Sequence, residues 1–250
     1  MIRDFNYVFL DVGNVLFHDS AVEMVFYYLI YQQLTPSAKN AFFSTREKAL
    51  YRGNIGWIYE YCSENRLDSD SDPASAAWGI VLENWIDINK PIDDAIEALY
   101  QLHKITPIAI AANQPQQTTQ LLEKYGITEL VDHVFLDDLI GVSKPQDEFF
   151  NKILMLTKQK AENVLYVGDR VDNDIIPATK NGITPIWIQY TPSILHSSFV
   201  PKWWEDAFYQ SYRKIGAYSL WSVCDSFDEN QIPYKYQNLH HFVKEFYIKH

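Results

Sequence analysis

Four polar side chains, Asp11, Asn113, Lys144 and Asp169, have the chemistry needed to bind a metal ion and a charged ligand. Two carboxylates, together with backbone oxygens, suit a hard divalent cation such as Mg²⁺. A lysine beside a carboxylate can neutralise phosphate charge and keep that carboxylate ionised. A carboxylate can also be the nucleophile in covalent catalysis. The four side chains can act together only if the fold brings them to one place.

Short apolar runs rich in β-forming residues precede three of these side chains and predict buried strands. The runs are Tyr7–Leu10 before Asp11, Pro107–Ala112 before Asn113, and Val164–Val167 before Gly168 and Asp169. Lys144 lies just before a predicted helix. The carboxyl ends of parallel strands share one edge of a sheet, and ligands of open α/β folds bind at that edge. We therefore expect the four side chains to converge there.

Helix and strand patterns alternate from Pro91 onward. The predicted helices are Pro91–His103, Thr118–Tyr125, Gln146–Thr157 and Asp174–Asn181, and the further strands are Val134–Leu136 and Thr184–Ile188. Repeated β–α units of this kind predict an α/β fold, a doubly wound parallel sheet with helices on both faces. The predicted core comprises residues 1–17 and 91–190.

An all-helical insertion is predicted between the first strand and the rest of the sheet, over residues 18–90. Its helices are Ala21–Gln33, Pro36–Leu50, Ile55–Glu64 and Pro73–Trp85. Ser20 is a plausible N-cap of the first helix, and Thr35-Pro36 gives the second an N-cap followed by proline at the first helical position. No strand pattern interrupts this region.

The last part of the chain, residues 191–250, follows no β–α rhythm and is rich in aromatic residues. These are Trp203, Trp204, Phe208, Tyr209, Tyr212, Tyr218, Trp221, Tyr234, Tyr236, Phe242, Phe246 and Tyr247. We predict a C-terminal extension that packs its aromatic side chains on the core. The alternative is an exposed aromatic surface, which would form a partner site or a homodimer interface.

Composition predicts a soluble cytoplasmic protein. The chain has 250 residues, 47% of them hydrophobic, which is ample for a large core. Its net charge of -11 argues against nucleic acid as a partner. Cys62 and Cys224 are far apart, which favours reduced thiols. The start, MIRDFN, has no signal-peptide pattern, and the most apolar helix candidate, Val22–Leu34, is too short to span a membrane.

The segments FLDVGNVL, AIAANQ, GVSKP and LYVGDRVDND, in this order, resemble the haloacid dehalogenase-like (HAD) hydrolase superfamily. The resemblance covers Tyr7–Leu16 and about Pro91–Ile188, and the helical block Ala21–Trp85 matches the type of cap inserted after the first motif. It implies a Rossmann-like core, Mg²⁺ as cofactor and a small phosphorylated metabolite as substrate. With Arg52-Gly53-Asn54-Ile55, the motif DVGNVL is closest to sugar-phosphate phosphatases of the superfamily whose first motif also carries glycine.

The resemblance also implies roles for individual residues. Asp11 would be the nucleophile that forms an aspartyl-phosphate. Lys144, Asn113 and Asn14 would contact the phosphoryl group, Lys144 and Asn113 with catalytic roles. The metal would be held by Asp11, by the backbone carbonyl of Gly13, by Asp169, and by Asp174 directly or through water.

Two residues depart from the usual family pattern. Gly13 stands where most phosphatases of the family have a second aspartate that serves as general acid and base, help worth roughly 10²–10⁴-fold. His18 and Asp19 are the nearest candidates to replace it. Ala112 stands where serine or threonine is usual, which removes a phosphoryl hydrogen bond worth about 1.5–3 kcal/mol. Asn113 could partly substitute for that hydroxyl.

Three functions are compatible with these residues. The first is a Mg²⁺-dependent phosphohydrolase or phosphotransferase. The second is a catalytically impaired HAD fold that serves as a binding or assembly module. The third is another reaction such as dehalogenation, against which Asp169 and Asp174 argue, because dehalogenases do not need the metal carboxylates. The candidates for substrate selection are cap residues, namely Tyr27, Tyr28, Arg52, Trp57 and Tyr61.

Overall fold

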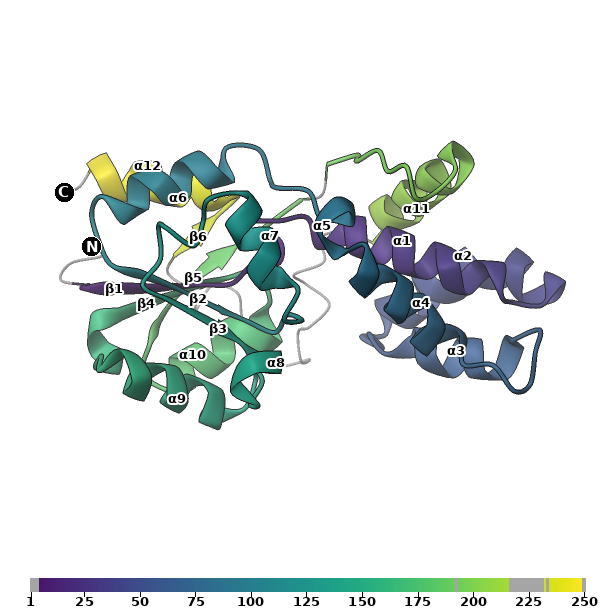
Figure 1. Ribbon diagram of the computed structural model, residues 1–250, viewed down its shortest axis with the longest axis horizontal. Coiled ribbons are helices and arrows are strands. Elements are labelled where there is room, and N and C mark those ends of the chain that lie inside the picture. The colour runs from purple at the N-terminus through teal and green to yellow at the C-terminus, as the bar shows by residue number, and fades with distance from the viewer. Residues whose placement is uncertain (1–4, 192, 216–231, 233, 249–250) are drawn as a thin grey trace.

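The structure, a computed structural model, describes residues 5–191, 193–215, 232 and 234–248. A parallel sheet covered by helices lies at one end of the molecule, and a block of helices lies at the other (Figure 1). The chain enters this helical block directly after the first strand and returns to the sheet through α6.

Within the described residues, the sheet has six strands in the order β3-β2-β1-β4-β5-β6, all of them parallel. The strands are β1 (Tyr7–Leu10), β2 (Ile108–Ala112), β3 (His133–Leu136), β4 (Val164–Gly168), β5 (Thr184–Ile188) and β6 (Lys235–Tyr236). Every residue of β1, β2 and β4 is buried, because helices cover both faces and the strands therefore read as continuous apolar runs. The predicted doubly wound parallel sheet is confirmed.

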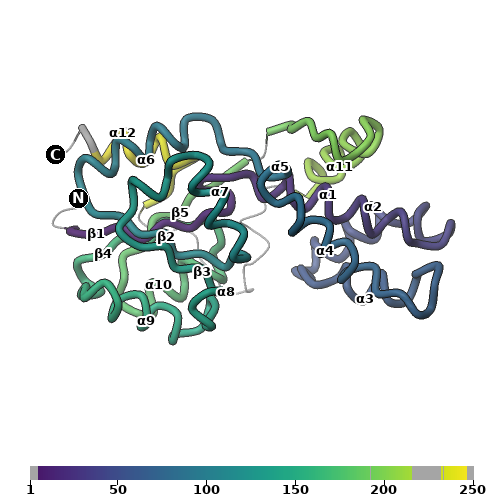
Figure 2. The backbone as a smooth tube through the Cα atoms, in the orientation of Figure 1, coloured from purple at the N-terminus to yellow at the C-terminus, as the bar shows by residue number. Residues whose placement is uncertain are grey.

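Helices cover both faces of the sheet, and each face has its own hydrophobic core. Figures 1 and 2 show α6, α7 and α12 on one face and α8, α9 and α10 on the other. Side chains of β1 alternate between them, so Val8 and Leu10 join the core under α6, while Tyr7 and Phe9 join the core over α9. The helices are α6 (Ala95–His103), α7 (Thr118–Lys124), α8 (Asp137–Ile140), α9 (Asp147–Thr157), α10 (Ile176–Lys180) and α12 (Leu239–Ile248).

Local backbone geometry moves some element boundaries away from the predicted ones. Asp94 has a left-handed φ of 62°, so α6 begins at Ala95 rather than at Pro91. The predicted helix 174–181 is split, because a π-helical turn, Val171–Ile175, precedes α10. A 3-10 turn over Ala161–Asn163 leads into β4.

The helical block consists of α1 (Asp19–Gln32), α2 (Pro36–Tyr51), α3 (Trp57–Asn65), α4 (Pro73–Glu83) and α5 (Trp85–Ile88). The predicted N-cap Thr35 accepts a hydrogen bond from the Ala38 backbone at 3.4 Å. Asp72 caps α4 in the same way through the Ser75 backbone. None of the helices in the described residues is long and apolar enough to cross a lipid bilayer.

The C-terminal segment divides between the two parts of the molecule, whereas the sequence predicts that it packs on the core. Helix α11 (Lys202–Ile215) packs on α1 and α2 of the helical block, whereas β6 and α12 lie at the sheet. The reason is that α1 and α2 present aromatic rings, which the buried aromatic face of α11 covers. Tyr218, Trp221 and Cys224 lie outside the described residues.

Burial of these aromatic residues bears on the homodimer alternative. Trp204, Phe208, Tyr209 and Tyr212 are all buried within the chain. Of the aromatic residues of α11, Trp203 is the one that stays exposed, at 53%. The described part of the segment therefore does not form the exposed aromatic surface that a dimer interface would require.

A buried arginine connects α11 to the helical block. The Arg46 guanidinium on α2 is fully buried and lies 3.1 Å from Glu23 Oε1 on α1. It also donates to Ser211 Oγ on α11 at 3.1 Å and stacks over the Phe208 ring. Breaking such a buried pair leaves an uncompensated charge, so Arg46 fixes how the three helices sit together.

We expect Trp204→Ala to lower the free energy of unfolding by about 3–5 kcal/mol. The Trp204 ring is fully buried between α11 and α2, and its N–H donates to the Met24 carbonyl on α1 at 2.9 Å. Trp203→Ala is the matched control, with a much smaller expected loss because its ring is half exposed. Urea unfolding measures both, and equal losses would show that α11 is not anchored through Trp204.

Candidate functional site

The carboxyl ends of the central strands bring the polar residues together. Asp11 follows β1, Asn113 follows β2, and Asp169 follows β4. The register places Leu10, the last residue of β1, beside Ile110 and Val167 of its neighbours. The three side chains therefore start from the same edge of the sheet, as the sequence predicts.

Lys144 lies between two carboxylates. Its Nζ is 3.0 Å from Asp11 Oδ1 and 2.7 Å from Asp174 Oδ1, and all three side chains are buried. The Asn113 side chain holds the main chain of Lys144, because Oδ1 accepts from the Lys144 N–H and Nδ2 donates to its carbonyl, each at 2.9 Å. Asn113 thus positions Lys144 through two hydrogen bonds.

Asp174 is held in place by the turn that carries it. Its Oδ2 accepts a hydrogen bond from the Arg170 N–H at 2.9 Å, while its Oδ1 contacts Lys144. The carboxyl group lies so close to β4 that a β-carbon on Gly168 would come within 2.6 Å of it. Residue 168 must therefore be glycine for Asp174 to occupy this place.

Asn14 connects the first turn with Asp169. It has a left-handed φ of 53°, which asparagine tolerates better than most residues. Its Nδ2 donates to Asp169 Oδ2 at 3.0 Å, and its Oδ1 accepts from the Asp19 N–H at 3.2 Å. The sequence predicts that the Asn14 side chain contacts phosphate. In the structure, both the nitrogen and the oxygen of its amide are hydrogen bonded to other residues of the protein.

Trp187 is a site residue that sequence reasoning missed. Its indole N–H donates to the Asp169 backbone carbonyl at 2.9 Å, and its ring is fully buried in β5. The sequence shows only one apolar residue within an apolar strand. Its relation to Asp169 depends on the pairing of β4 with β5, which no local pattern specifies.

Acidic groups outnumber basic groups in the site. Oxygens of Asp11, Asp169 and Asp174 lie within 4.8 Å of one another, and Lys144 supplies a single positive charge among them. Burial, followed by repulsion from Asp174 and Asp11, holds the pKa of Asp169 well above its usual range. Three hard oxygen donors with excess negative charge could hold a divalent metal ion.

The same charges shift the pKa values of the neighbouring groups. Burial raises the pKa of Asp11 to about 6, with Lys144 lowering it and Asp174 raising it. Burial lowers the pKa of Lys144, but Asp11 and Asp174 outweigh it and keep that pKa well above its usual range. Burial and the Asp11 carboxylate raise the pKa of Asp19 to about 7. Lys144 is therefore a permanent cation in the site.

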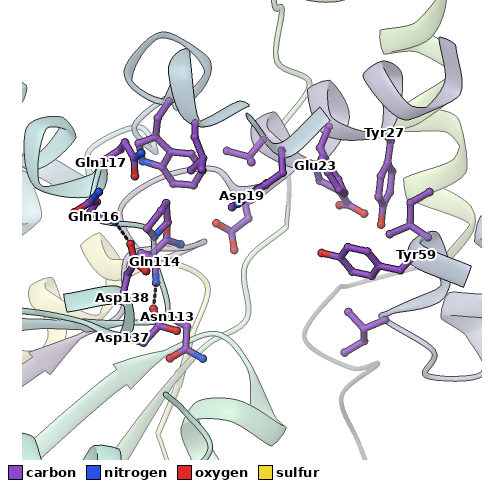
Figure 3. Close-up of a pocket in the computed structure, with 18 of the residues that line it drawn as sticks. Asp19, Glu23, Tyr27, Tyr59, Asn113, Gln114, Gln116, Gln117, Asp137 and Asp138 are labelled. Atoms are coloured by element: carbon purple, nitrogen blue, oxygen red, sulfur yellow. Dashed lines mark hydrogen bonds between the residues drawn. The ribbon is translucent and has the colours of Figure 1, made fainter. Parts of the chain in front are cut away.

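A cavity of about 680 Å³ lies between the carboxyl edge of the sheet and the helical block (Figure 3). Polar residues of the core line one side, among them Asn113 and Gln114, and residues of α1, α3 and α4 line the other. Of the five cap residues predicted to select substrate, Tyr27 lines this cavity. Trp57 and Tyr61 contact the Phe42 ring within the block. Tyr28 contacts the Trp204 ring of α11, and Arg52 is exposed at the end of α2.

The two candidates for the missing proton-transfer group lie in different environments. Asp19 lines the cavity, and Figure 3 shows its carboxylate pointing into it. His18 is buried, its Nδ1 is hydrogen bonded to the Tyr190 hydroxyl, and it lines a separate cavity with Asp93 and Asp94. Geometry therefore favours Asp19.

Comparison with known proteins agrees with this architecture. The sequence profile of the haloacid dehalogenase-like hydrolases matches residues 5–182. Glyceraldehyde 3-phosphate phosphatase of Pyrococcus furiosus is 28% identical over 145 residues, which span 56% of this chain and 60% of that enzyme. The enzyme of the same name from Methanocaldococcus jannaschii is 33% identical over 124 residues, spanning 47% and 53% of the two chains.

A solved structure has a similar fold. It is the magnesium-bound HAD hydrolase YfnB of Bacillus subtilis, with a TM-score of 0.63 and 18% identity. The superposition covers 99% of both chains.

We expect Asn14→Ala to destabilise the protein more than Asn14→Gly does, by about 1 kcal/mol, in the absence of divalent cations. Both variants lose the hydrogen bonds to Asp169 and Asp19, but only alanine must also adopt the left-handed backbone with a β-carbon. Urea unfolding compares the two variants. Equal stabilities would show that residue 14 contributes through its side chain alone.

Proposed function

Because the chain belongs to the haloacid dehalogenase-like hydrolases, we propose that it hydrolyses a small phosphomonoester through an aspartyl-phosphate on Asp11. The observation that carries the proposal is the buried contact of Lys144 Nζ with Asp11 Oδ1 at 3.0 Å. Asn113, which holds the main chain of Lys144, lines a cavity large enough for a metabolite. The relatives named as phosphatases support it.

The attack on phosphorus is assigned to Asp11 Oδ2. The Val12 N–H donates to Oδ1 at 2.8 Å and Lys144 Nζ contacts the same oxygen, so these two donors fix the orientation of the carboxylate. As Oδ2 attacks, the ester P–O bond breaks and the phosphoryl group becomes attached to Asp11. The ammonium of Lys144 then lies beside the phosphoryl oxygens and offsets their charge.

Mg²⁺ is the proposed cofactor, held by Asp11, Asp169 and the Gly13 backbone carbonyl. Both oxygens of Asp174 are already engaged, by Lys144 and by the Arg170 N–H, which favours contact with the metal through water. The bound ion would supply positive charge to the phosphoryl oxygens. Asn113 would act by holding Lys144 at the phosphoryl site.

The lining of the cavity points to a substrate whose non-phosphate part carries no negative charge. Among the described residues that line it, four are acidic and none is lysine or arginine; the acidic ones are Asp19, Glu23, Asp137 and Asp138. A carboxylate on the substrate would meet repulsion there. The remainder of glyceraldehyde 3-phosphate is small and neutral, so substrates of that class fit.

We expect phosphate release from glycerol phosphate and from p-nitrophenyl phosphate in the presence of Mg²⁺, and slower release from monoesters of similar size that carry a carboxylate. Asp11→Asn should reduce every activity to the uncatalysed background, because the amide is not a nucleophile. Asp147→Asn is the control, since the Asp147 side chain is half-buried, is paired with Lys180 and does not line the cavity. A phosphate-release assay measures all of these rates.

The outcomes separate the proposed function from its alternative. Activity that survives Asp11→Asn unchanged would place hydrolysis elsewhere. If the wild-type protein turns over none of these esters but still binds Mg²⁺, the chain would act as a catalytically impaired binding module.

We expect isothermal calorimetry to detect Mg²⁺ binding that Asp169→Asn weakens by more than about tenfold. The substitution removes one of the buried carboxylate charges while preserving the size of the side chain. Asp147→Asn should bind Mg²⁺ like the wild-type protein. Equal affinities in the wild type and Asp169→Asn would remove Asp169 from the metal site.

A further inference from the structure

The space beside Gly13 is occupied by a carboxylate from another part of the chain. A β-carbon built on Gly13 would lie 2.3 Å from Asp19 Oδ2 and 2.5 Å from Asp19 Oδ1. No real β-carbon tolerates such a contact, so a side chain at residue 13 and the present position of Asp19 exclude each other. Asp19 thus places a carboxyl group where a side chain at residue 13 would begin.

A hydrogen bond and the start of a helix fix the backbone of Asp19. Its backbone N–H donates to Asn14 Oδ1 at 3.2 Å, and Asn14 in turn contacts Asp169. Asp19 is also the first residue of α1, so its backbone belongs to a regular helix. Its carboxylate lines the cavity that also contains Asn113, and Figure 3 shows it pointing into that space.

The other acidic residues that line the cavity interact with groups other than Gly13. Glu23 is paired with Arg46 at 3.1 Å. Asp137 accepts the Gln114 N–H at 2.8 Å, and Asp138 accepts the Gln116 N–H at 3.0 Å. None of these three is among the atoms nearest to Gly13, whereas three atoms of Asp19 are.

We propose that Asp19 is the general acid and base of this hydrolase, delivered over Gly13 from the first turn of the helical block. The inference rests on the proposed phosphatase function and names the group that such a reaction requires. It also explains why residue 13 is glycine, because only glycine leaves room for the carboxyl group of Asp19.

The two steps balance with Asp19 as the carrier of one proton. In the first, Asp11 Oδ2 bonds to phosphorus, the ester P–O bond breaks, and the leaving oxygen takes the proton of the Asp19 carboxyl group. In the second, water attacks phosphorus, gives a proton to the Asp19 carboxylate, and the bond between phosphorus and Asp11 breaks. Inorganic phosphate leaves, and both aspartates return to their starting states.

The test is Asp19→Asn, which keeps the shape of the side chain and removes its proton-transfer capacity. Turnover of glycerol phosphate should fall by roughly 10²–10⁴-fold, since its alkoxide leaves only when protonated. With p-nitrophenyl phosphate, whose leaving group needs little protonation, the variant should still release a rapid burst of about one nitrophenolate per site. Slow turnover should follow, because attack by water lacks its base.

Controls separate this inference from the proposed function. The wild type and Asp11→Asn report on the proposed function, while the contrast between the two esters in Asp19→Asn reports on Asp19. Asp147→Asn should keep the wild-type contrast, and thermal unfolding checks that Asp19→Asn folds. Glycerol phosphate turnover unchanged by Asp19→Asn, or equal loss of the first step for both esters, would overturn the assignment.

A second set of variants tests the shared space directly. Gly13→Asp alone should lower stability, because its β-carbon displaces the Asp19 carboxylate and crowds two acidic side chains into one space. Adding Asp19→Gly removes that clash and places a carboxyl group on residue 13 instead, so the double variant should turn over glycerol phosphate faster than Asp19→Gly does. Glycerol phosphate turnover by the double variant that is no faster than that of Asp19→Gly would contradict the inference.

Discussion

The buried charge cluster at the carboxyl edge of the sheet is the constraint on which the rest of the site depends. Asp11, Asp169 and Asp174 are buried close together, and such carboxylates repel one another unless a cation compensates them. Lys144 touches two of the three and therefore cannot be moved without leaving uncompensated charge. The two hydrogen bonds from the Asn113 side chain to the main chain of Lys144 hold this cation in place between the carboxylates.

Local sequence chemistry predicts much of the fold and the convergence of the site. Alternating helix and strand patterns predict a parallel sheet, and the ends of its strands then bring Asp11, Asn113 and Asp169 together. The sequence predicts contact of Asn113 with phosphate, and the structure adds two hydrogen bonds from its amide to the main chain of Lys144. These bonds are not predictable, because the approach of residues 113 and 144 depends on a loop conformation that no periodicity encodes. The sequence also does not predict that α11 packs on α1 and α2. An aromatic helix face shows that the helix is buried, but it does not identify the apolar surface against which the helix packs.

The sequence alone also cannot identify Asp19 as the proton-transfer group. The sequence reveals a missing carboxylate at Gly13 and offers two neighbouring candidates, His18 and Asp19. Adjacent residues at the start of a helix point in different directions, so only the three-dimensional structure separates them. His18 turns to Tyr190, and Asp19 turns into the space above Gly13. The absence of a side chain at Gly13 is thus explained by the Asp19 side chain, which occupies the space beside it.

Supplying this carboxylate from the helical block makes the block part of the active site. Asp19 and Glu23 are four residues apart and therefore share one face of α1. Glu23 is held by Arg46 of α2, and Arg46 also contacts Ser211 of α11. The rotation of α1 about its axis, and with it the direction of Asp19, is therefore fixed by contacts with α2 and α11. The C-terminal segment, although far from Asp11 in the sequence, thereby determines where the proton-transfer group stands.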